Sequence, residues 1–264
     1  MLAGITLVAN GTEMGYPYEA CIRNLLSCCD KVFVNTESEN RDDTLTRLLS
    51  FGERVVVLPT AWDWSVTNGV DLAHRANMCA HEAANSGFKH VLYVQADEVV
   101  NPTEVERLKP RLGKFNMELQ RTYFWGDLKT VNKTWTLPIG RMGNLSEFRV
   151  LGDGMFAAFT RSIPTVRVPP EVCRIYHYSR VGDSKAIARR LNTLDSLFHS
   201  EGTYTPLSDY VLGKNNNFEE GAEGAELASV EEFFKTGAPL SVHPPGILDF
   251  YSSGTHTGGP YAGD

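Results

Sequence analysis

Two adjacent carboxylates follow a strand-forming run in the segment HVLYVQADEVV, residues 90–100. The run HVLYV is typical of a buried strand, and Asp97 and Glu98 come shortly after it. A carboxylate at the end of a buried strand loses hydration energy unless a cation or a hydrogen-bond donor pairs with it. A divalent metal ion could be that partner. The alternative is a cap for a helix that starts near Pro102, but a cap accounts for one carboxylate and not for two. The pattern therefore favours a metal site.

The elements that must position this pair alternate between strand and helix over the first hundred residues. Strands are expected at 4–10, 31–35, 54–58 and 90–95, and helices at 17–29, 42–51 and 69–87. This alternation predicts an α/β fold of Rossmann type, with a mostly parallel sheet and helices on both faces. Ligands of such sheets bind beyond the carboxyl ends of the strands. Asn10, Glu37 and Asp97 all follow strand ends, so we expect them on one rim.

The second half of the chain has weaker patterns. Irregular strands are expected between 113 and 181, followed by a helix over 183–200. From 213 the sequence is rich in Gly, Asn and Glu, which is typical of linkers and flexible tails. We therefore expect one domain over 1–212, with halves at 1–112 and 113–212, and an acidic linker and tail over 213–264.

Composition limits the class of protein. The chain has 264 residues with 42% hydrophobic and 22% charged residues, which is enough to build a full core. No stretch approaches the roughly 20 apolar residues of a membrane helix, and the N-terminus lacks the basic region of a signal peptide. A cytoplasmic location is expected. The five cysteines form no C-x-x-C pair, so neither a zinc site nor a disulfide framework is expected.

Charge is distributed unevenly along the chain. The net charge is −7, but residues 141–190 hold nine Lys or Arg against four Asp or Glu. Residues 201–264 hold two Lys or Arg against ten Asp or Glu. A basic middle in an acidic chain indicates an anionic ligand, and the alternative is a solvated, arginine-rich surface.

Common phosphate-binding motifs are absent from the sequence. There is no G-x-G-x-x-G after the first strand and no P-loop lysine motif. This disfavours dinucleotide-binding enzymes and P-loop NTPases. A rim that carries carboxylates can instead neutralise a pyrophosphate through a bound divalent cation.

Five segments resemble the GT-A glycosyltransferases in the order expected. The segment LYVQADEVVNPTEVERL resembles the strand end at which an acidic D-x-D-like motif holds Mn²⁺ or Mg²⁺. The resemblance is to the inverting, nucleotide-sugar-dependent enzymes, and among them to a bacterial and phage group that reads Q-A-D-E here. It covers roughly residues 3–250, and the other matching segments are 8–44, 61–83, 175–190 and 241–250.

The resemblance implies a metal-dependent enzyme that moves a sugar from a nucleotide sugar, expected to be a UDP-sugar, to an acceptor hydroxyl with inversion. Residues 1–112 would bind the nucleotide sugar and residues 113–212 the acceptor. Asp97 would be a direct ligand of Mn²⁺ or Mg²⁺. The first acidic position of D-x-D is Gln95 here, so its role would be hydrogen bonding. His177 resembles a late histidine that serves as a second metal ligand, and its alternative is a core histidine.

The resemblance also implies donor contacts at several positions. Each has a plain structural alternative, such as a strand-end turn, a surface arginine or a buried tryptophan. The expected nucleotide-sugar contacts are Asn10, Glu37, Trp62, Arg75, Gln95, Ala96 and Arg180.

An inverting transfer needs a general base that takes the proton of the acceptor hydroxyl. Asp153 fits best because its flanking glycines allow close approach of a substrate, although Asp between glycines is also an ordinary turn. Glu147 is the second candidate.

Two other functions stay open on the sequence. A nucleotidyltransferase shares the fold type and the metal logic, but its first strand is usually followed by a basic, glycine-rich loop, and NGTEMGYP has no Lys or Arg. A non-catalytic nucleotide-binding module would use the same rim. The donor sugar, the acceptor and the oligomeric state are not indicated. A glycan acceptor is favoured over a modified DNA base because the net charge is −7.

Overall fold

The computed structural model describes residues 1–66, 69–134, 136, 138–152, 156–160, 162–182, 186–190, 193, 227–234 and 242–253. Its N-terminal half is an all-parallel sheet with the strand order β3-β2-β1-β4. These strands are β1 (Leu2–Val8), β2 (Lys31–Glu37), β3 (Val55–Thr60) and β4 (His90–Tyr93). The connecting helices are α1 (Gly11–Met14), α2 (Tyr18–Cys28), α3 (Thr44–Leu49) and α4 (Val70–Asn85). The predicted α/β class, with a Rossmann-type parallel half, is confirmed.

The second half extends this sheet with strands of both directions. β8 pairs antiparallel with β4, β6 pairs antiparallel with β8, and β12 runs parallel to β6. The strands added here are β5 (Glu98–Val100), β6 (Asn116–Gly126), β7 (Thr130–Asn132), β8 (Pro138–Asn144), β11 (Thr165–Arg167), β12 (Arg174–Val181) and β13 (Leu227–Ser229). A separate hairpin is formed by β9 (Phe148–Leu151) and β10 (Phe156–Phe159). The short helices are α5 (Pro102–Leu108), η1 (Lys109–Arg111), η2 (Leu145–Glu147), α8 (Val230–Phe234) and α9 (Ile247–Ser252).

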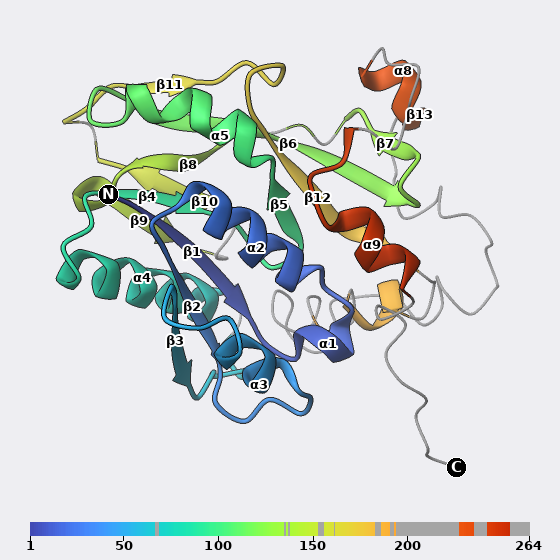
Figure 1. Ribbon diagram of the computed structural model, residues 1–264, viewed down its shortest axis with the longest axis horizontal. Coiled ribbons are helices and arrows are strands. Elements are labelled where there is room, and N and C mark those ends of the chain that lie inside the picture. Colours follow the sequence, from blue (N-terminus) through green and yellow to red (C-terminus); the bar gives the residue numbers. More distant parts are fainter. Residues whose placement is uncertain are drawn as a thin grey trace.

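Helices cover both faces of the parallel half, and α2 and α4 lie on either side of β1 (Figure 1). The α2 face holds one hydrophobic core, to which helix α5 and the two strands β6 and β12 also contribute. The α4 face holds a second core that includes the β9–β10 hairpin. α4 packs closely because its buried residues are small and recur at helical spacing: Ala73, Ala76, Cys79, Ala80 and Ala83. On the other face, Gly4 leaves room for Leu25 and Cys29, since a Cβ there would lie 3.3–3.4 Å from their side chains.

The C-terminal segment 242–253 packs against the domain. Ile247 is fully buried, and the Asn24 side chain donates a 2.8 Å hydrogen bond to the Pro245 carbonyl. β13 pairs with β7. The boundary expected at 212 lies outside the described residues and stays a prediction, as does most of the helix expected over 183–200, of which 186–190 are helical. No helix in the described part of the chain is long and apolar enough to cross a membrane.

Candidate active site

One edge of the sheet collects the carboxyl ends of six strands. β1, β2, β3 and β4 are parallel, and β6 and β12 share their direction because β8 runs antiparallel between β4 and β6. Most of the residues that the sequence predicts for the site lie in or just after the last residues of these strands. Asn10, Glu37, Trp62, Gln95, Ala96, Asp97, His177 and Arg180 all lie at this rim.

Asp97 and His177 meet at the centre of the rim. Asp97 Oδ2 lies 3.5 Å from His177 Nε2, and the two side chains are 14% and 8% exposed. Backbone pairing fixes their approach, since the Tyr178 N–H donates a 2.8 Å hydrogen bond to the Asp97 carbonyl. His177 also pairs with Glu98 in the β5–β12 register. The Ser179 hydroxyl lies 3.2 Å from His177 Nδ1.

The protonation states of this pair suit a cation. Burial and the neighbouring Glu98 carboxylate raise the pKa of Asp97 to about 6. Burial and four nearby arginines hold the pKa of His177 well below its usual range. At neutral pH the histidine is therefore a neutral ligand with an available lone pair, and Asp97 is an anion whose charge is costly to keep buried alone. A divalent cation would relieve that cost.

The donor set fits Mn²⁺ or Mg²⁺ held together with a phosphate ligand. In the described residues no group of three or more His, Cys, Asp and Glu side chains could hold a metal ion. A carboxylate and an imidazole supply two ligands, which leaves positions for phosphate oxygens and water, as is common for cations that bind through a substrate diphosphate.

Glu98 does not face this pair. Its Oε1 lies 2.5 Å from Arg121 Nε and 2.9 Å from Arg141 Nη2, and its Oε2 accepts a 2.9 Å hydrogen bond from the Gln95 N–H. The Gln95 side chain accepts a 2.7 Å hydrogen bond from Arg121. Glu98 and Gln95 therefore fix the turn that carries Asp97.

Asn10 joins the two loops that follow β1 and β2. It has a left-handed backbone with φ 49°, and its Oδ1 accepts a 2.7 Å hydrogen bond from the Arg41 N–H. Its own N–H donates to Asn40 Oδ1 at 2.6 Å. Asn10 thereby holds the loop after β1 against the loop after β2.

Glu37 organises the loop after β3. It accepts hydrogen bonds from the Trp62 N–H at 3.1 Å and from the Trp64 indole at 3.0 Å. The Trp62 indole donates to Asn35 Oδ1 at 2.8 Å, and the two tryptophan rings lie 5.5 Å apart. Trp64 is 40% exposed, and its contact with Glu37 holds its ring beside that of Trp62.

The two predicted arginines differ in their surroundings. Arg75, on α4, makes a bidentate ion pair with Asp71, with distances of 3.0 and 2.8 Å. Arg180 lies at the end of β12, with its guanidinium 5.2 Å from the centre of the Trp125 ring. Ala96 is buried, and the turn that contains it is closed by a 2.9 Å hydrogen bond from the Glu98 N–H to the Gln95 carbonyl.

Of the two predicted bases, the structure describes only Glu147, which lies away from Asp97. Glu147 lies at the opposite edge of the sheet, beside the start of β4, where Leu145 N–H bonds to the Lys89 carbonyl. Its carboxylate accepts a 2.9 Å hydrogen bond from Asn116 and is 6% exposed, which is the setting of a structural residue. Asp153 lies outside the described residues.

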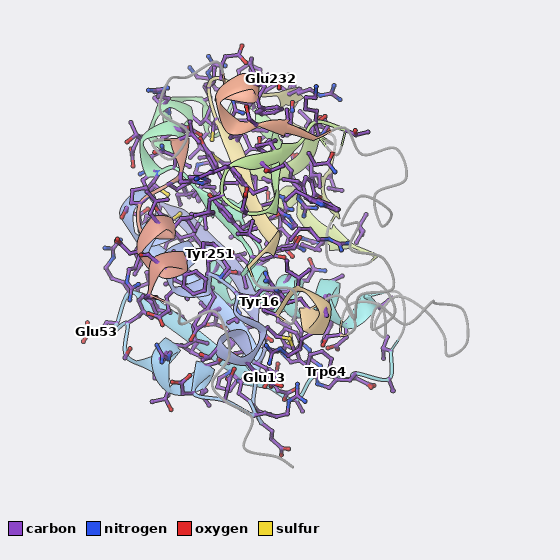
Figure 2. The ribbon with its side chains drawn as sticks, turned by 90° about the vertical axis from the view of Figure 1, so that its right-hand side faces the viewer. Glu13, Tyr16, Glu53, Trp64, Glu232 and Tyr251 are labelled. Atoms are coloured by element: carbon purple, nitrogen blue, oxygen red, sulfur yellow. The ribbon has the colours of Figure 1, made fainter. Side chains whose placement is uncertain are left out.

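Three further residues at the centre of the rim were not anticipated. Arg190 is fully buried, donates to the Tyr178 and Val181 carbonyls, and acts electrostatically on Asp97. Tyr16 and Tyr251 both interact with Arg190 and Asp97, and Figure 2 labels both. Tyr251 comes from the segment expected to be a tail, so no local pattern could have placed it here.

Comparison with known proteins gives weak likenesses to solved structures. A scan against protein-family models found no match, and neither did a search of curated proteins. A fragment of S. aureus TarS in complex with UDP is 11% identical, with a TM-score of 0.44, over 73% of this chain and 64% of that fragment. Glucosyl-3-phosphoglycerate synthase from Mycobacterium tuberculosis, in complex with Mn²⁺, UDP and glucosyl-3-phosphoglycerate, is 13% identical, with a TM-score of 0.40, over 76% of this chain and 82% of that one.

A Bacillus anthracis protein named as a glucose-1-phosphate thymidylyltransferase is 13% identical, with a TM-score of 0.36, over 67% of this chain and 72% of that one. Likenesses at these scores carry no argument about activity or ligand. The function has to be argued from the rim itself.

Proposed function

We propose that this chain is a metal-dependent glycosyltransferase that transfers a sugar from a nucleotide sugar, with a UDP-sugar as donor, to an acceptor hydroxyl. The observation that carries the proposal is the Asp97–His177 pair at the rim. The pair supplies one carboxylate and one neutral imidazole, 3.5 Å apart, where the strands of the parallel half end. Diphosphates of substrates bind at such rims.

In this proposal each part of the rim has a role. Asp97 and His177 hold Mn²⁺ or Mg²⁺, which when bound neutralises the charge that develops on the leaving diphosphate. Glu98, Gln95 and Arg121 keep the Asp97 turn in place. Asn10 and Glu37 hold the loops around the nucleoside, and Trp62 contributes an aromatic wall beside Glu37. Arg180 adds positive charge on the donor side, and Arg75, which is paired with Asp71, would contribute a hydrogen-bond donor.

The acceptor half would supply the base. Asp153, which lies outside the described residues, takes the proton of the acceptor hydroxyl as that oxygen attacks the anomeric carbon. The bond from that carbon to the diphosphate breaks, and the configuration inverts. Glu147, at the far edge, is the weaker candidate.

The test is UDP binding by calorimetry with and without Mn²⁺. We expect wild type to bind UDP far more tightly with Mn²⁺, and Asp97→Asn to lose this enhancement while melting no lower than wild type without metal. Asp30→Asn, an exposed carboxylate at the opposite edge, is the matched control and should keep it. Undiminished Mn²⁺-dependent binding in Asp97→Asn would refute the assignment.

Product analysis separates the two alternatives. A glycosyltransferase incubated with a UDP-sugar and Mn²⁺ slowly releases UDP, because water can replace the acceptor. A nucleotidyltransferase would instead release pyrophosphate from UTP and a sugar 1-phosphate. A binding module would release neither. The segment after β1 counts against the nucleotidyltransferase, since residues 9–17 contain no Lys or Arg.

A further inference from the structure

Two arginines share one carboxylate beneath the rim. Arg121 from β6 and Arg141 from β8 both contact Glu98 Oε1, and none of the three side chains is more than 2% exposed. Asp97 also acts on Arg121, and Arg190 acts on Asp97, so this group holds three arginines against two carboxylates and has one excess positive charge. Buried charge without a partner is costly, so an excess of this kind calls for an explanation.

Arg141 carries the excess. Within the described part of the chain, its Nε and Nη1 atoms are buried and have no hydrogen-bond partner. Its other close contact is the face of the Tyr93 ring, 4.9 Å from the guanidinium carbon. Burial and Arg121 lower the pKa of Arg141, whereas Glu98 raises the pKa of Arg121 despite its burial. Arg121 therefore interacts more strongly with the Glu98 carboxylate than Arg141 does.

The position of Arg141 relates it to the proposed reaction. It shares Glu98 with the turn that carries Asp97, and it is one of the arginines whose charge reaches His177. It belongs to β8, on the side of the rim where the second half of the chain begins. In the proposed reaction the sugar lies between the donor half and the acceptor half, and β8 belongs to the acceptor half.

We propose that Arg141 recognises a carboxylate on the transferred sugar, so that the donor is a nucleotide-linked uronic acid. This rests on the proposed function and names its substrate class. A carboxylate brings the single negative charge that the group lacks, and it accepts hydrogen bonds from guanidinium N–H groups. Because Arg141 is closed off from solvent, binding must be accompanied by movement of the side chains around it.

A structural role and a ligand-binding role of Arg141 predict different melting temperatures for Arg141→Met. If Arg141 serves to balance Glu98, Arg141→Met should lower the melting temperature of the metal-free protein. If Arg141 instead serves to bind an anionic substrate group, removing it leaves Glu98 paired one to one with Arg121. The melting temperature should then be unchanged or higher. Arg54→Met, at the opposite edge, is the control for ligand binding, and it should melt below wild type because Arg54 donates hydrogen bonds to the Leu26 and Cys29 carbonyls.

The experiment is calorimetry with Mn²⁺ and UDP, UDP-glucose or UDP-glucuronate. We expect wild type and Arg54→Met to bind UDP-glucuronate at least about tenfold more tightly than UDP-glucose, the size of one charge-assisted hydrogen bond. Arg141→Met should bind UDP as wild type does, with the ratio between the two sugars reduced to about one. Equal affinities in wild type, or an unchanged ratio in Arg141→Met, would overturn the inference.

Free sugars separate this inference from the proposed function. Thermal melting is measured with D-glucuronate, glucose and glucose 6-phosphate at matched ionic strength. Stabilisation of wild type by glucuronate that is lost in Arg141→Met supports the carboxylate site even if UDP does not bind, in which case only the proposed function fails. Stabilisation by glucose 6-phosphate and not by glucuronate would overturn the carboxylate assignment.

Discussion

Asp97 and Glu98 are adjacent in the chain but have different partners. Asp97 approaches His177, while Glu98 turns inward to two buried arginines. Asp97 is the last residue of the turn between β4 and β5, and Glu98 is the first residue of β5, so one side chain can reach a ligand while the next anchors the turn. An acidic pair at a strand end can thus contain one ligand and one support.

The base is tested at the residue scale by Asp153→Asn. The substitution keeps size and polarity but removes the ability to accept a proton. We expect transfer to fall by about 10²–10⁴-fold, the usual contribution of general-base catalysis, with UDP affinity unchanged. Single-turnover transfer and UDP binding are the measurements.

Glu147→Gln is the comparison for this experiment. Glu147 accepts its hydrogen bond from Asn116 at the opposite edge of the sheet, so its loss should affect stability more than transfer. If Glu147→Gln is the crippled enzyme and Asp153→Asn is near wild type, the two roles must be exchanged. If neither slows transfer more than a few-fold, the base lies elsewhere.

At the scale of elements, the sequence predicts local structure well and long-range pairing poorly. The four strands and the helices α2, α3 and α4 up to Val94 follow from periodicity, whereas the short helix α1 was not predicted. The shared rim follows from the parallel direction of the strands. The pairing of β6 with β12 joins residues some 50 positions apart, and Tyr251 reaches the rim through a segment that reads as a tail. No spacing rule links such segments, because tertiary packing alone brings them together.

The loop after β3 should respond to acid through Glu37. Burial alone would raise the pKa of Glu37, but hydrogen bonds from Glu39, Trp62, Trp64 and Ser38 hold it below its ordinary value of 4.5. A lowered pKa contributes stability that is present above the ordinary value and is lost as the pH falls through the lower, folded value. Tryptophan emission should therefore change below about pH 4.5.

Glu37→Gln removes the titrating group. We expect this variant to show little emission change in that pH window and to be less stable than wild type at pH 7, with the difference shrinking in acid. Glu53→Gln, which is exposed, should behave as wild type. An identical acid response in Glu37→Gln and wild type would assign the change to another group.

The C-terminal segment is held to the sheet by His243. Its Nδ1 lies 2.9 Å from the Tyr178 hydroxyl and its Nε2 2.9 Å from the Leu128 carbonyl, and its ring packs on Phe124. His243→Ala removes both hydrogen bonds and leaves the buried Tyr178 hydroxyl without this partner. We expect the free energy of unfolding to fall by roughly 2–4 kcal/mol in urea titrations. Leu248→Ala, exposed on α9, should change it by about 0.5 kcal/mol or less, and equal losses in both variants would contradict the anchoring role.

On the scale of the whole molecule, part of the basic middle of the chain lies inside the protein. Of the nine basic residues in 141–190, Arg141 and Arg190 are fully buried, whereas Arg167 is exposed and lies 3.7 Å from Glu118. Two of these positive charges therefore lie inside the protein, next to the proposed donor site. The surface that remains belongs to a chain with a net charge of −7.

This charge distribution predicts weak binding to nucleic acid, with an affinity that depends little on salt concentration. A protein that uses 6–10 phosphate contacts loses about 10³–10⁵ in affinity between 50 and 200 mM salt. We expect fluorescence anisotropy with a labelled duplex to show no such steep loss here, because the buried arginines cannot contact phosphates and the acidic surface repels them. Tight duplex binding at 50 mM salt that collapses at 200 mM would instead indicate a DNA acceptor. Arg141→Met would then separate the two uses of positive charge, since a phosphate-contacting surface keeps its salt dependence when an interior guanidinium is removed.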